Sequence, residues 1–193
     1  MTLDVTVHQA LEKIGSLSMT TLDGDTPHSR IISICGSDDN GIYFLTMNVK
    51  PFYRQLKKNP RISLCGIYPS GRKTGKNAVG QPTWPPGFTL RITGEAREIS
   101  AAEVKQKADA GDAVHQYFLE DAARYPAIRC FCIHTGRGEI FDYDFEMEKR
   151  DHKLIRMRFA FGGDRVNEGG ARIDPDACIA CGECFEACTF KAI

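Results

Sequence analysis

Half of the chain's eight cysteines lie in its last sixteen residues, "CIACGECFEACTFKAI". These four follow the spacing C-x2-C-x2-C-x3-C: Cys178, Cys181, Cys184 and Cys188. Thiolates at the first three positions can face inward from a tight loop and hold three corners of one [4Fe–4S] cubane. Ala180, Gly182 and Ala187 are small enough to let the backbone fold close to the cluster, where N–H groups can donate to its sulfurs.

A zinc site and a metal-free cluster of thiols both fit this cysteine run less well. Structural zinc sites generally use two knuckles separated by a spacer, whereas these cysteines form one compact run. A metal-free cysteine cluster is disfavoured because so short a segment, poor in apolar residues, cannot bury enough surface to fold alone. The run therefore predicts a [4Fe–4S] cluster that also holds its own segment together.

The surrounding stretch, "ARIDPDACIACGECFEACTFKAI", closely resembles the repeat of bacterial-type four-iron ferredoxins over about the last twenty residues. The resemblance implies that Cys178, Cys181 and Cys184 bind one cluster. It departs from that family at Thr189, where proline is usual. In two-cluster ferredoxins the fourth cysteine of a run serves the other cluster, but this chain has a single run.

Three sources stay open for the fourth cluster ligand. Cys188 could bind the cluster of the partner protomer, so that a two-fold dimer forms one composite two-cluster ferredoxin. It could instead complete the cluster of its own chain. A cysteine from the preceding part of the chain is the third possibility: Cys65, Cys130 or Cys132.

A second group of residues suits a phosphate. Arg30, Thr46 and Lys50 offer a guanidinium fork, a hydroxyl and an ammonium at close strand positions. They belong to "PHSRIIS" and "GIYFLTMNVKPFYRQLKKNPRISLCG". The order and spacing of these motifs resemble the FMN-binding split barrels of the pyridoxamine 5′-phosphate oxidase superfamily, over roughly residues 15–160.

This second resemblance implies an FMN site and a homodimer with the flavin at the subunit interface. The residues implied along the isoalloxazine ring and ribityl chain are Arg30, Ile31, Ile32 and Ser33. Those implied at the phosphate end are Thr46, Met47, Asn48 and Lys50. Gln55 lies on the following helix, where it could reach the flavin, although such a residue is more often found at the surface. Trp84, in a long loop, could cover a flavin or plug the barrel mouth.

The chain also departs from true pyridoxamine-phosphate oxidases. The stretch "MNVKPF" offers Lys50 alone where a basic pair is expected, and "IRMRFAFGG" does not resemble the family's substrate segment. An iron–sulfur segment follows instead. These departures argue against oxidation of vitamin B6.

The elements that must position these residues are mainly strands. Strands are expected in "LSMTTLD", "PHSRIISICG", "IYFLTM", "RISLCGIY", "TLRITGEAREI" and "HKLIRMRFAFGG", with a hairpin in "AIRCFCIHTGRGEIFDYDF" that turns at "TGRG". Helices are expected near the N-terminus, in "KPFYRQLKKNP", and in "SAAEVKQKADAG", where Ser100 and Glu103 form a capping box. At least seven strands with peripheral helices favour a closed or partly closed β-barrel, because closure removes exposed edges.

The composition changes after residue 162. "GGDRVNEGGARIDPDA" is polar and rich in glycine, which is typical of a linker. We therefore expect a split-barrel domain over residues 1–162 and a linker with a ferredoxin-like segment over residues 163–193. The segment 164–193 holds six acids and three bases, so it is locally acidic.

Composition excludes several classes of partner. The formal net charge is zero, which gives no general field for nucleic acid or an anionic membrane, and no apolar stretch is long enough to span a bilayer. The N-terminus does not resemble a secretory signal. The remaining cysteines lie in apolar, strand-like runs and are expected to be small buried hydrophobes: Cys35, Cys65, Cys130 and Cys132. Together with the reduced thiolates of the tail, this favours a cytoplasmic protein.

These features predict a flavin- and iron–sulfur-dependent oxidoreductase. It would pass electrons between a [4Fe–4S] cluster and FMN, to or from a small-molecule substrate or a redox partner protein. No catalytic acid or base stands out. The alternatives are a non-catalytic electron carrier, a redox or oxygen sensor, or a barrel that binds F420 or haem in place of FMN.

Overall fold

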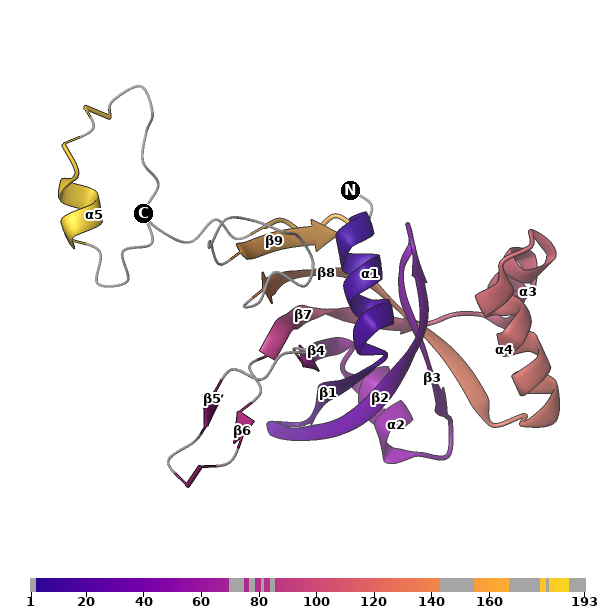
Figure 1. Ribbon diagram of the computed structural model, residues 1–193. Coiled ribbons are helices and arrows are strands. Elements are labelled where there is room, and N and C mark those ends of the chain that lie inside the picture. Colours follow the sequence, from indigo (N-terminus) through magenta and orange to yellow (C-terminus); the bar gives the residue numbers. More distant parts are fainter. Residues whose placement is uncertain are drawn as a thin grey trace.

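The computed structural model describes residues 3–69, 75–76, 79–80, 82–83, 86–142, 155–166, 178–179 and 181–187. Its main sheet is antiparallel and seven-stranded, in the order β3-β2-β1-β4-β7-β8-β9 (Figure 1). The strands of this sheet are β1 (Ser16–Asp23), β2 (Thr26–Asp38), β3 (Gly41–Met47), β4 (Arg61–Pro69), β7 (Pro86–Glu98), β8 (Ile128–Asp142) and β9 (Ile155–Phe161). β5 (Gly75–Lys76) and β6 (Pro82–Thr83) form a separate two-stranded sheet.

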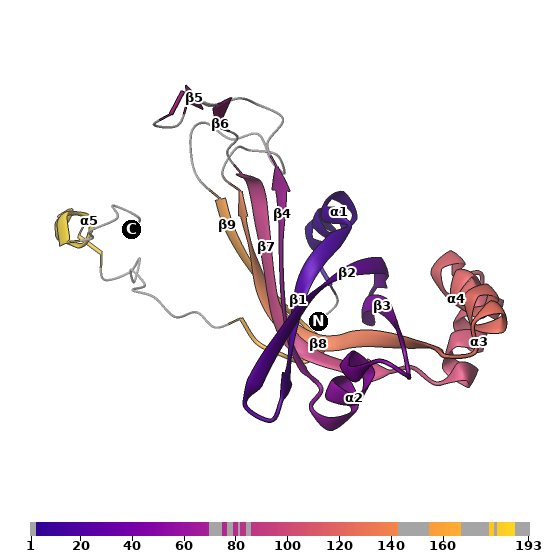
Figure 2. The same ribbon diagram turned by 90° about the horizontal axis from the view of Figure 1, so that it is seen from below.

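An additional pairing between β3 and β8 closes six of the seven strands into a barrel and leaves β9 outside it. The first half of β8, from Ile128 to Ile133, pairs with β3, and the second half, from Gly136 to Asp142, pairs with β9. One strand therefore belongs to both the barrel and the sheet that extends from it. In Figure 2, β4, β7, β8 and β9 run side by side through this extension. The mainly β, split-barrel architecture expected from the sequence is confirmed.

The hairpin expected at "TGRG" is wrong, because β8 runs through it without a turn. Its two glycines instead allow a close approach between neighbouring strands. A Cβ atom at Gly138 would lie 2.2 Å from the carbonyl oxygen of Arg91, and one at Gly136 would lie 2.7 Å from that of Thr93. The glycines are therefore required by strand packing, and the local sequence alone does not distinguish this need from a turn.

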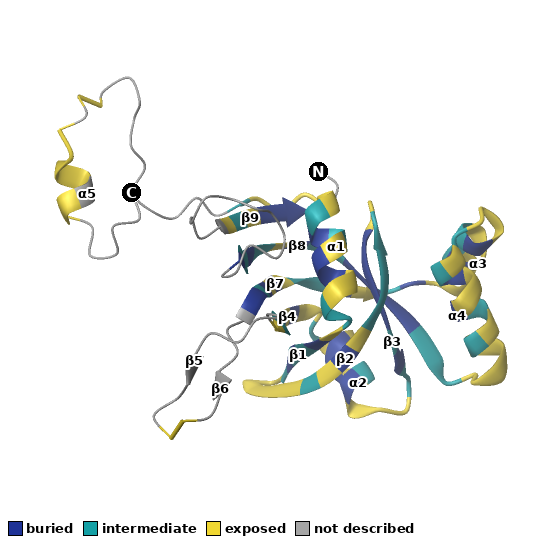
Figure 3. Cartoon of the chain, viewed as in Figure 1, coloured by how far each residue is buried: buried dark blue, intermediate teal, exposed yellow. Residues whose placement is uncertain are grey.

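Burial alternates along β1 and β4, as expected for strands with one face on a core. Leu17, Met19 and Thr21 of β1 point inward, and Leu64 and Leu90 are fully buried on the neighbouring strands. Figure 3 shows buried residues of the barrel strands in dark blue. The inward position of Thr21 matters for the site described below.

Helices flank the barrel: α1 (Val5–Ile14), α2 (Pro51–Lys58), α3 (Ala101–Asp109) and α4 (Ala113–Arg124). α3 begins as expected, since Ser100 Oγ accepts from the backbone N–H of Glu103 at 3.1 Å. α4 was not expected from the sequence. Its N-cap is Asp112, whose carboxylate accepts from the N–H groups of Val114 and His115. Among the described residues, no helix combines the length and apolar character needed to cross a bilayer.

A polar contact joins α3 to the barrel. Lys107 Nζ donates to Asp38 Oδ2 at 2.7 Å, and the Tyr43 hydroxyl donates to Asp38 Oδ1 at 2.8 Å. Burial alone would raise the pKa of Asp38, but these hydrogen bonds outweigh it and lower the pKa from its usual value. The charged form of Asp38 therefore stabilises the packing of α3 on the sheet.

After β9 the structure describes residues 162–166, 178–179 and 181–187. β9 ends at Phe161, and the next two residues, Gly162 and Gly163, have positive φ angles of 62° and 88°. The expected domain boundary near residue 163 stays a prediction. A short helix, α5 (Glu183–Ala187), lies within the cysteine run.

Candidate functional site

A cleft of about 660 Å³ opens beside β2, β3 and the start of α2. This volume lies within the range of small-molecule and cofactor sites. Six of the eight predicted cofactor-binding residues line it: Arg30, Ile31, Ile32, Ser33, Thr46 and Lys50. Gln55 lines the cleft as well, and so do residues that the sequence did not assign to the cofactor: His28, Cys35, Leu45, Pro51, Phe52 and Tyr117.

Arg30 is held in the cleft by a defined set of contacts. Its Nη1 donates to Thr21 Oγ1 at 2.7 Å, its Nη2 donates to Gln55 Oε1 at 2.9 Å, and its guanidinium lies 4.3 Å from the centre of the Phe52 ring. Burial lowers the pKa of Arg30 from its usual value, although an arginine keeps its charge in proteins. Arg30 thus supplies a fixed positive charge at the cleft.

For Gln55 the sequence left two alternatives, and the favoured one, a surface position, is wrong because the residue is buried at the cleft. Its side chain is 5% exposed, and Oε1 accepts from Thr21 as well as from Arg30, the former at 2.7 Å. The reason is helical geometry, because Phe52, Gln55 and Leu56 share the face of α2 that packs on the barrel. An amide on that face needs partners, and it finds them in two residues that are distant in sequence.

Thr46 shows the clearest sign of a missing partner. Its side chain is 5% exposed, and within the described structure Oγ1 is buried without a hydrogen bond. A buried hydroxyl that is left unpaired is unfavourable by about 1–3 kcal/mol. Because Thr46 lines the cleft beside Lys50, this hydroxyl is suited to a polar ligand atom.

Met47 and Asn48 do not line the cleft. Asn48 N donates to the carbonyl of Ala127 at 2.9 Å, and Lys50 N donates to the carbonyl of Met47 at 3.0 Å. Both residues therefore shape the turn that leads from β3 into α2. Their assignment to the phosphate end of FMN stays a prediction, as do the assignments of the six lining residues.

The tail cysteines within the described chain are all exposed: Cys178, Cys181 and Cys184. Gly182 between them has a positive φ of 80°, which a side chain would disfavour. Cys188 lies outside the described residues, as does Trp84. Among the groups that the structure describes, no three His, Cys, Asp or Glu side chains are placed to hold a metal ion.

The four barrel cysteines do not share one environment. Cys130 and Cys132 are buried as expected, and burial raises the pKa of both thiols, that of Cys132 to about 12. Cys35 is partly buried, and burial raises its pKa as well. Cys65 is exposed, so the expectation that it is a buried hydrophobe is wrong. It lies on the outward face of β4, which the alternation of that strand turns to solvent.

Comparison with known proteins matches two family profiles to separate parts of the chain. The profile described as pyridoxamine 5′-phosphate oxidase covers residues 3–141, and the profile described as 4Fe-4S binding domain covers residues 171–193. No curated protein matched the sequence.

Several solved structures share the fold at low sequence identity. A pyridoxamine 5′-phosphate oxidase-related, FMN-binding protein from Nostoc punctiforme has 14% identity and a TM-score of 0.53, over 83% of this chain and 99% of that one. A NimC/NimA family protein from Clostridium acetobutylicum has 18% identity and a TM-score of 0.52, over 79% and 88%. A heme binding protein from Mycobacterium smegmatis has 12% identity and a TM-score of 0.50, over 81% and 59%.

Proposed function

The chain belongs to the pyridoxamine 5′-phosphate oxidase family and carries a 4Fe-4S ferredoxin motif, and we propose that it is an oxidoreductase that uses FMN and a [4Fe–4S] cluster. Electrons would pass between the cluster and the flavin, to or from a small substrate. A cluster exchanges one electron at a time and FMN one or two, so the pair could connect one-electron and two-electron chemistry.

The unpartnered Thr46 hydroxyl is the observation that carries the flavin part of this proposal. FMN presents a dianionic phosphate, a hydroxylated ribityl chain and a flat apolar ring. Thr46 would donate to the phosphate or a ribityl oxygen, while Arg30 and Lys50 supply positive charge. Ile32 and Phe52 provide buried apolar surface for the ring.

A partner subunit would complete this cleft. Three large apolar side chains in or beside it are exposed in the single chain: Ile31 at 71%, Val49 at 68% and Tyr117 at 55%. Exposed apolar groups gathered at one place favour an interface. We propose a homodimer with FMN at the subunit boundary. Light scattering on the purified protein would give twice the 21.5 kDa chain mass if this is correct.

Cys178, Cys181 and Cys184 would hold three corners of the cluster, with Cys188 of the partner protomer as the fourth ligand. Replacing Cys188 by Ser should then lose or convert the clusters of both protomers, as measured by electron paramagnetic resonance and iron content. Full four-iron clusters in this variant would exclude Cys188 as a ligand altogether.

The test of the function is an anaerobic purification with a visible spectrum and counts of iron, labile sulfide and flavin per chain. We expect about one FMN and four irons per chain. A Soret band would instead indicate haem, for which His28 in the cleft is an available ligand, and F420 fluorescence would indicate a deazaflavin. Protein that lacks iron and labile sulfide after anaerobic reconstitution would refute the cluster.

Enzyme and carrier differ in turnover. No carboxylate is found among the described residues that line the cleft, so proton transfer would depend on the flavin, on bound water or on the substrate. Steady-state oxidation of NAD(P)H or reduced ferredoxin with a small acceptor would support the enzyme. Reduction of the cofactors without turnover of any acceptor would favour the electron carrier.

A further inference from the structure

One row of residues crosses the outer face of the sheet from the candidate flavin cleft to its far edge. The register pairs these residues strand by strand, from β2 through β1, β4, β7 and β8 to β9: Ile31, Ser18, Cys65, Arg91, Glu139 and Arg158. Five steps of about 4.8 Å make this row roughly 24 Å long. The row begins at Ile31, which also lines the cleft.

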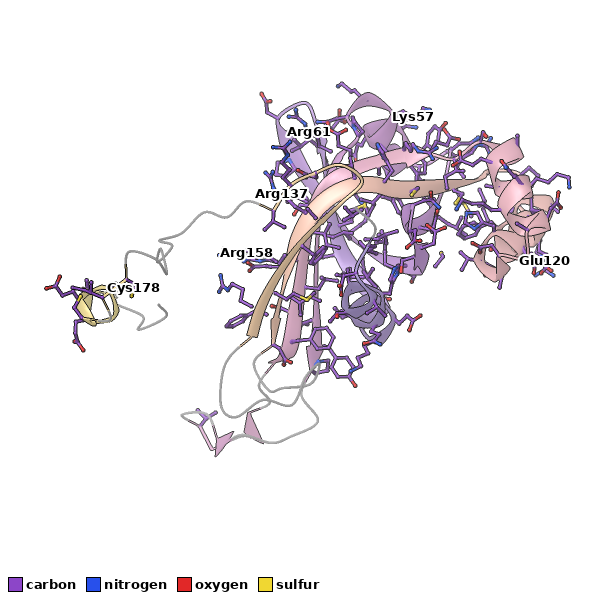
Figure 4. The ribbon with its side chains drawn as sticks, turned by 90° about the horizontal axis from the view of Figure 1, so that it is seen from above. Lys57, Arg61, Glu120, Arg137, Arg158 and Cys178 are labelled. Atoms are coloured by element: carbon purple, nitrogen blue, oxygen red, sulfur yellow. The ribbon has the colours of Figure 1, made fainter. Side chains whose placement is uncertain are left out.

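The far end of this face is rich in arginine. Arg137 and Phe141 flank Glu139 on β8, and Arg156 stacks on the Phe141 ring at 4.8 Å. We call Arg91, Arg137, Arg156 and Arg158 the arginine face. Arg91, Arg137 and Arg156 have side chains 65%, 50% and 48% exposed. Figure 4 shows Arg137 and Arg158 on the same side of the barrel.

Two adjoining hollows run along this face, with volumes of about 570 and 380 Å³. They share Cys65, Arg91 and Glu139, and the larger one reaches Ile31. Glu139 is the one acid among the described residues that line them, against four arginines. The hollows therefore form a continuous, positively charged groove that ends at the candidate flavin cleft.

The chain offers an occupant of opposite charge. Residues 164–193 hold six acids and three bases, and cluster thiolates would add further negative charge. The first of these acids already meets the arginine face, since Arg137 Nη1 lies 3.6 Å from Asp164 Oδ1. Val166 lines the smaller hollow, so the segment leaves the barrel at the groove itself.

The linker is long enough for this segment to return to the groove. Eleven residues, or twelve Cα–Cα steps, separate Val166 from Cys178. A flexible linker of that length has a root-mean-square span of roughly 19 Å and a maximum of about 40 Å. Every point of a row roughly 24 Å long is therefore within reach.

We propose that the arginine face is the docking surface for the acidic iron–sulfur segment of the same chain, and that docking brings the cluster to the groove that leads to the flavin cleft. The proposal rests on the proposed function in one respect, because the segment must carry its cluster to be folded. Each ion pair at such a surface is weak and screened by salt. A short linker compensates with an effective concentration on the order of 1 mM. The docked state should therefore be populated at low salt and open at high salt.

Cys65 reports on docking because it is exposed in the middle of the groove. The experiment uses the full chain with its cluster reconstituted and follows alkylation of Cys65 by iodoacetamide, read from its tryptic peptide by mass spectrometry. A segment that binds with a dissociation constant of about 0.3 mM would slow this reaction about fourfold. We expect that protection at low salt and its loss at about 1 M NaCl, where the screening length is about 3 Å.

Charge reversal tests the surface directly. The double variant Arg137→Glu/Arg158→Glu should alkylate about fourfold faster than the wild type at low salt. Adding Glu183→Lys/Glu186→Lys to this variant should restore the protection of Cys65, because the segment then carries the positive charges and the face the negative ones. The control Lys105→Glu/Arg124→Glu makes the same change in net charge on α3 and α4 and should leave the rate unchanged.

Equal rates in the wild type and the reversed variant, with full iron and sulfide content, would overturn docking and leave the proposed function standing. Protection of Cys65 that persists in the reversed variant and grows with protein concentration would assign the face to a second copy of the chain. That result would also overturn docking of the chain's own segment. A wild-type chain without iron would refute the proposed function, and docking of a folded cluster segment would fail with it.

Discussion

Replacing Thr46 by Val should have opposite effects on the empty and the loaded protein. The substitution keeps the shape of the side chain and removes a hydroxyl that is buried without a hydrogen bond in the described structure. An unpaired buried hydroxyl is unfavourable by about 1–3 kcal/mol, so its removal should stabilise the flavin-free protein by about 1 kcal/mol. For a chain of this size that raises the melting temperature by about 2–4 °C.

The same variant should bind FMN more weakly. A hydrogen bond from Thr46 to a charged phosphate oxygen contributes about 1.5–3 kcal/mol, so its loss corresponds to a roughly ten- to hundredfold rise in the dissociation constant. Thermal unfolding of flavin-free protein and quenching of FMN fluorescence on titration measure the two effects separately.

Thr21→Val is the matched control, because this threonine is equally buried but satisfied. Its hydroxyl donates to Gln55 and accepts from Arg30, so the substitution leaves two partners unpaired. We expect it to lower the free energy of unfolding by about 1–3 kcal/mol. If Thr46→Val destabilises the flavin-free protein as Thr21→Val does, or leaves FMN affinity unchanged, the assignment of the Thr46 hydroxyl to a ligand is refuted.

Three further substitutions test contacts that hold the site or the fold in place. Gln55→Leu removes the oxygen that accepts a hydrogen bond from Arg30. We expect flavin affinity to fall about tenfold, measured by fluorescence titration, and the free energy of unfolding to fall by about 1–3 kcal/mol, measured by urea unfolding. Unchanged affinity would show that the position of Arg30 does not matter for flavin binding. Asp38→Asn should lower the free energy of unfolding by about 1–2 kcal/mol at neutral pH, because the hydrogen bond from Lys107 holds the pKa of Asp38 below its usual 3.8. The lowered pKa means that this stability is present above about pH 4 and is lost as the pH falls through the folded pKa. The gap to the wild type should therefore narrow as the solution is acidified below about pH 4, and a gap independent of pH would contradict the reasoning. Gly138→Ala should lower the melting temperature by several degrees, because its Cβ would lie 2.2 Å from a backbone oxygen of β7, and a neutral result would show that the strands can separate at this point.

The strand content could be predicted from the sequence because it rests on local signals, whereas closure of the barrel was inferred from the number of strands, since closure removes exposed edges. Alternating burial, turn residues and the capping box at Ser100 are each visible within a few positions. The continuous path of β8 could not be predicted, since Gly136 and Gly138 look like turn residues until β7 is known to lie against them. α4 was also missed: its buried Phe118 packs with Val104 of α3 and with residues of β3 and β8, which come from other parts of the chain.

Much of the candidate site could also be predicted, but the residues that hold Arg30 in place could not. Arg30, Thr46 and Lys50 belong to motifs of recognisable order, and all three line one cleft. Thr21 and Gln55 lie in different elements, and their bond spans 34 residues of sequence, so no local pattern joins them. One signal was available, because Thr21 occupies an inward position of β1 after Leu17 and Met19. A polar residue at a core position needs a partner, and here the partner is part of the site.

The cysteines show how the same residue type divides into distinct roles once burial is known. Cys130 and Cys132 keep raised pKa values inside the barrel, so their thiols are neutral at physiological pH and poor ligands for iron. Of the three barrel candidates for a fourth cluster ligand, that leaves Cys65, which is exposed beside the arginine face. A docked iron–sulfur segment would lie over this residue. Cys65→Ser therefore tests whether the fourth cluster ligand is Cys65 itself or a cysteine of the tail. A cluster that survives it with unchanged iron content has its fourth ligand in the tail, and a cluster that is lost has its fourth ligand on β4.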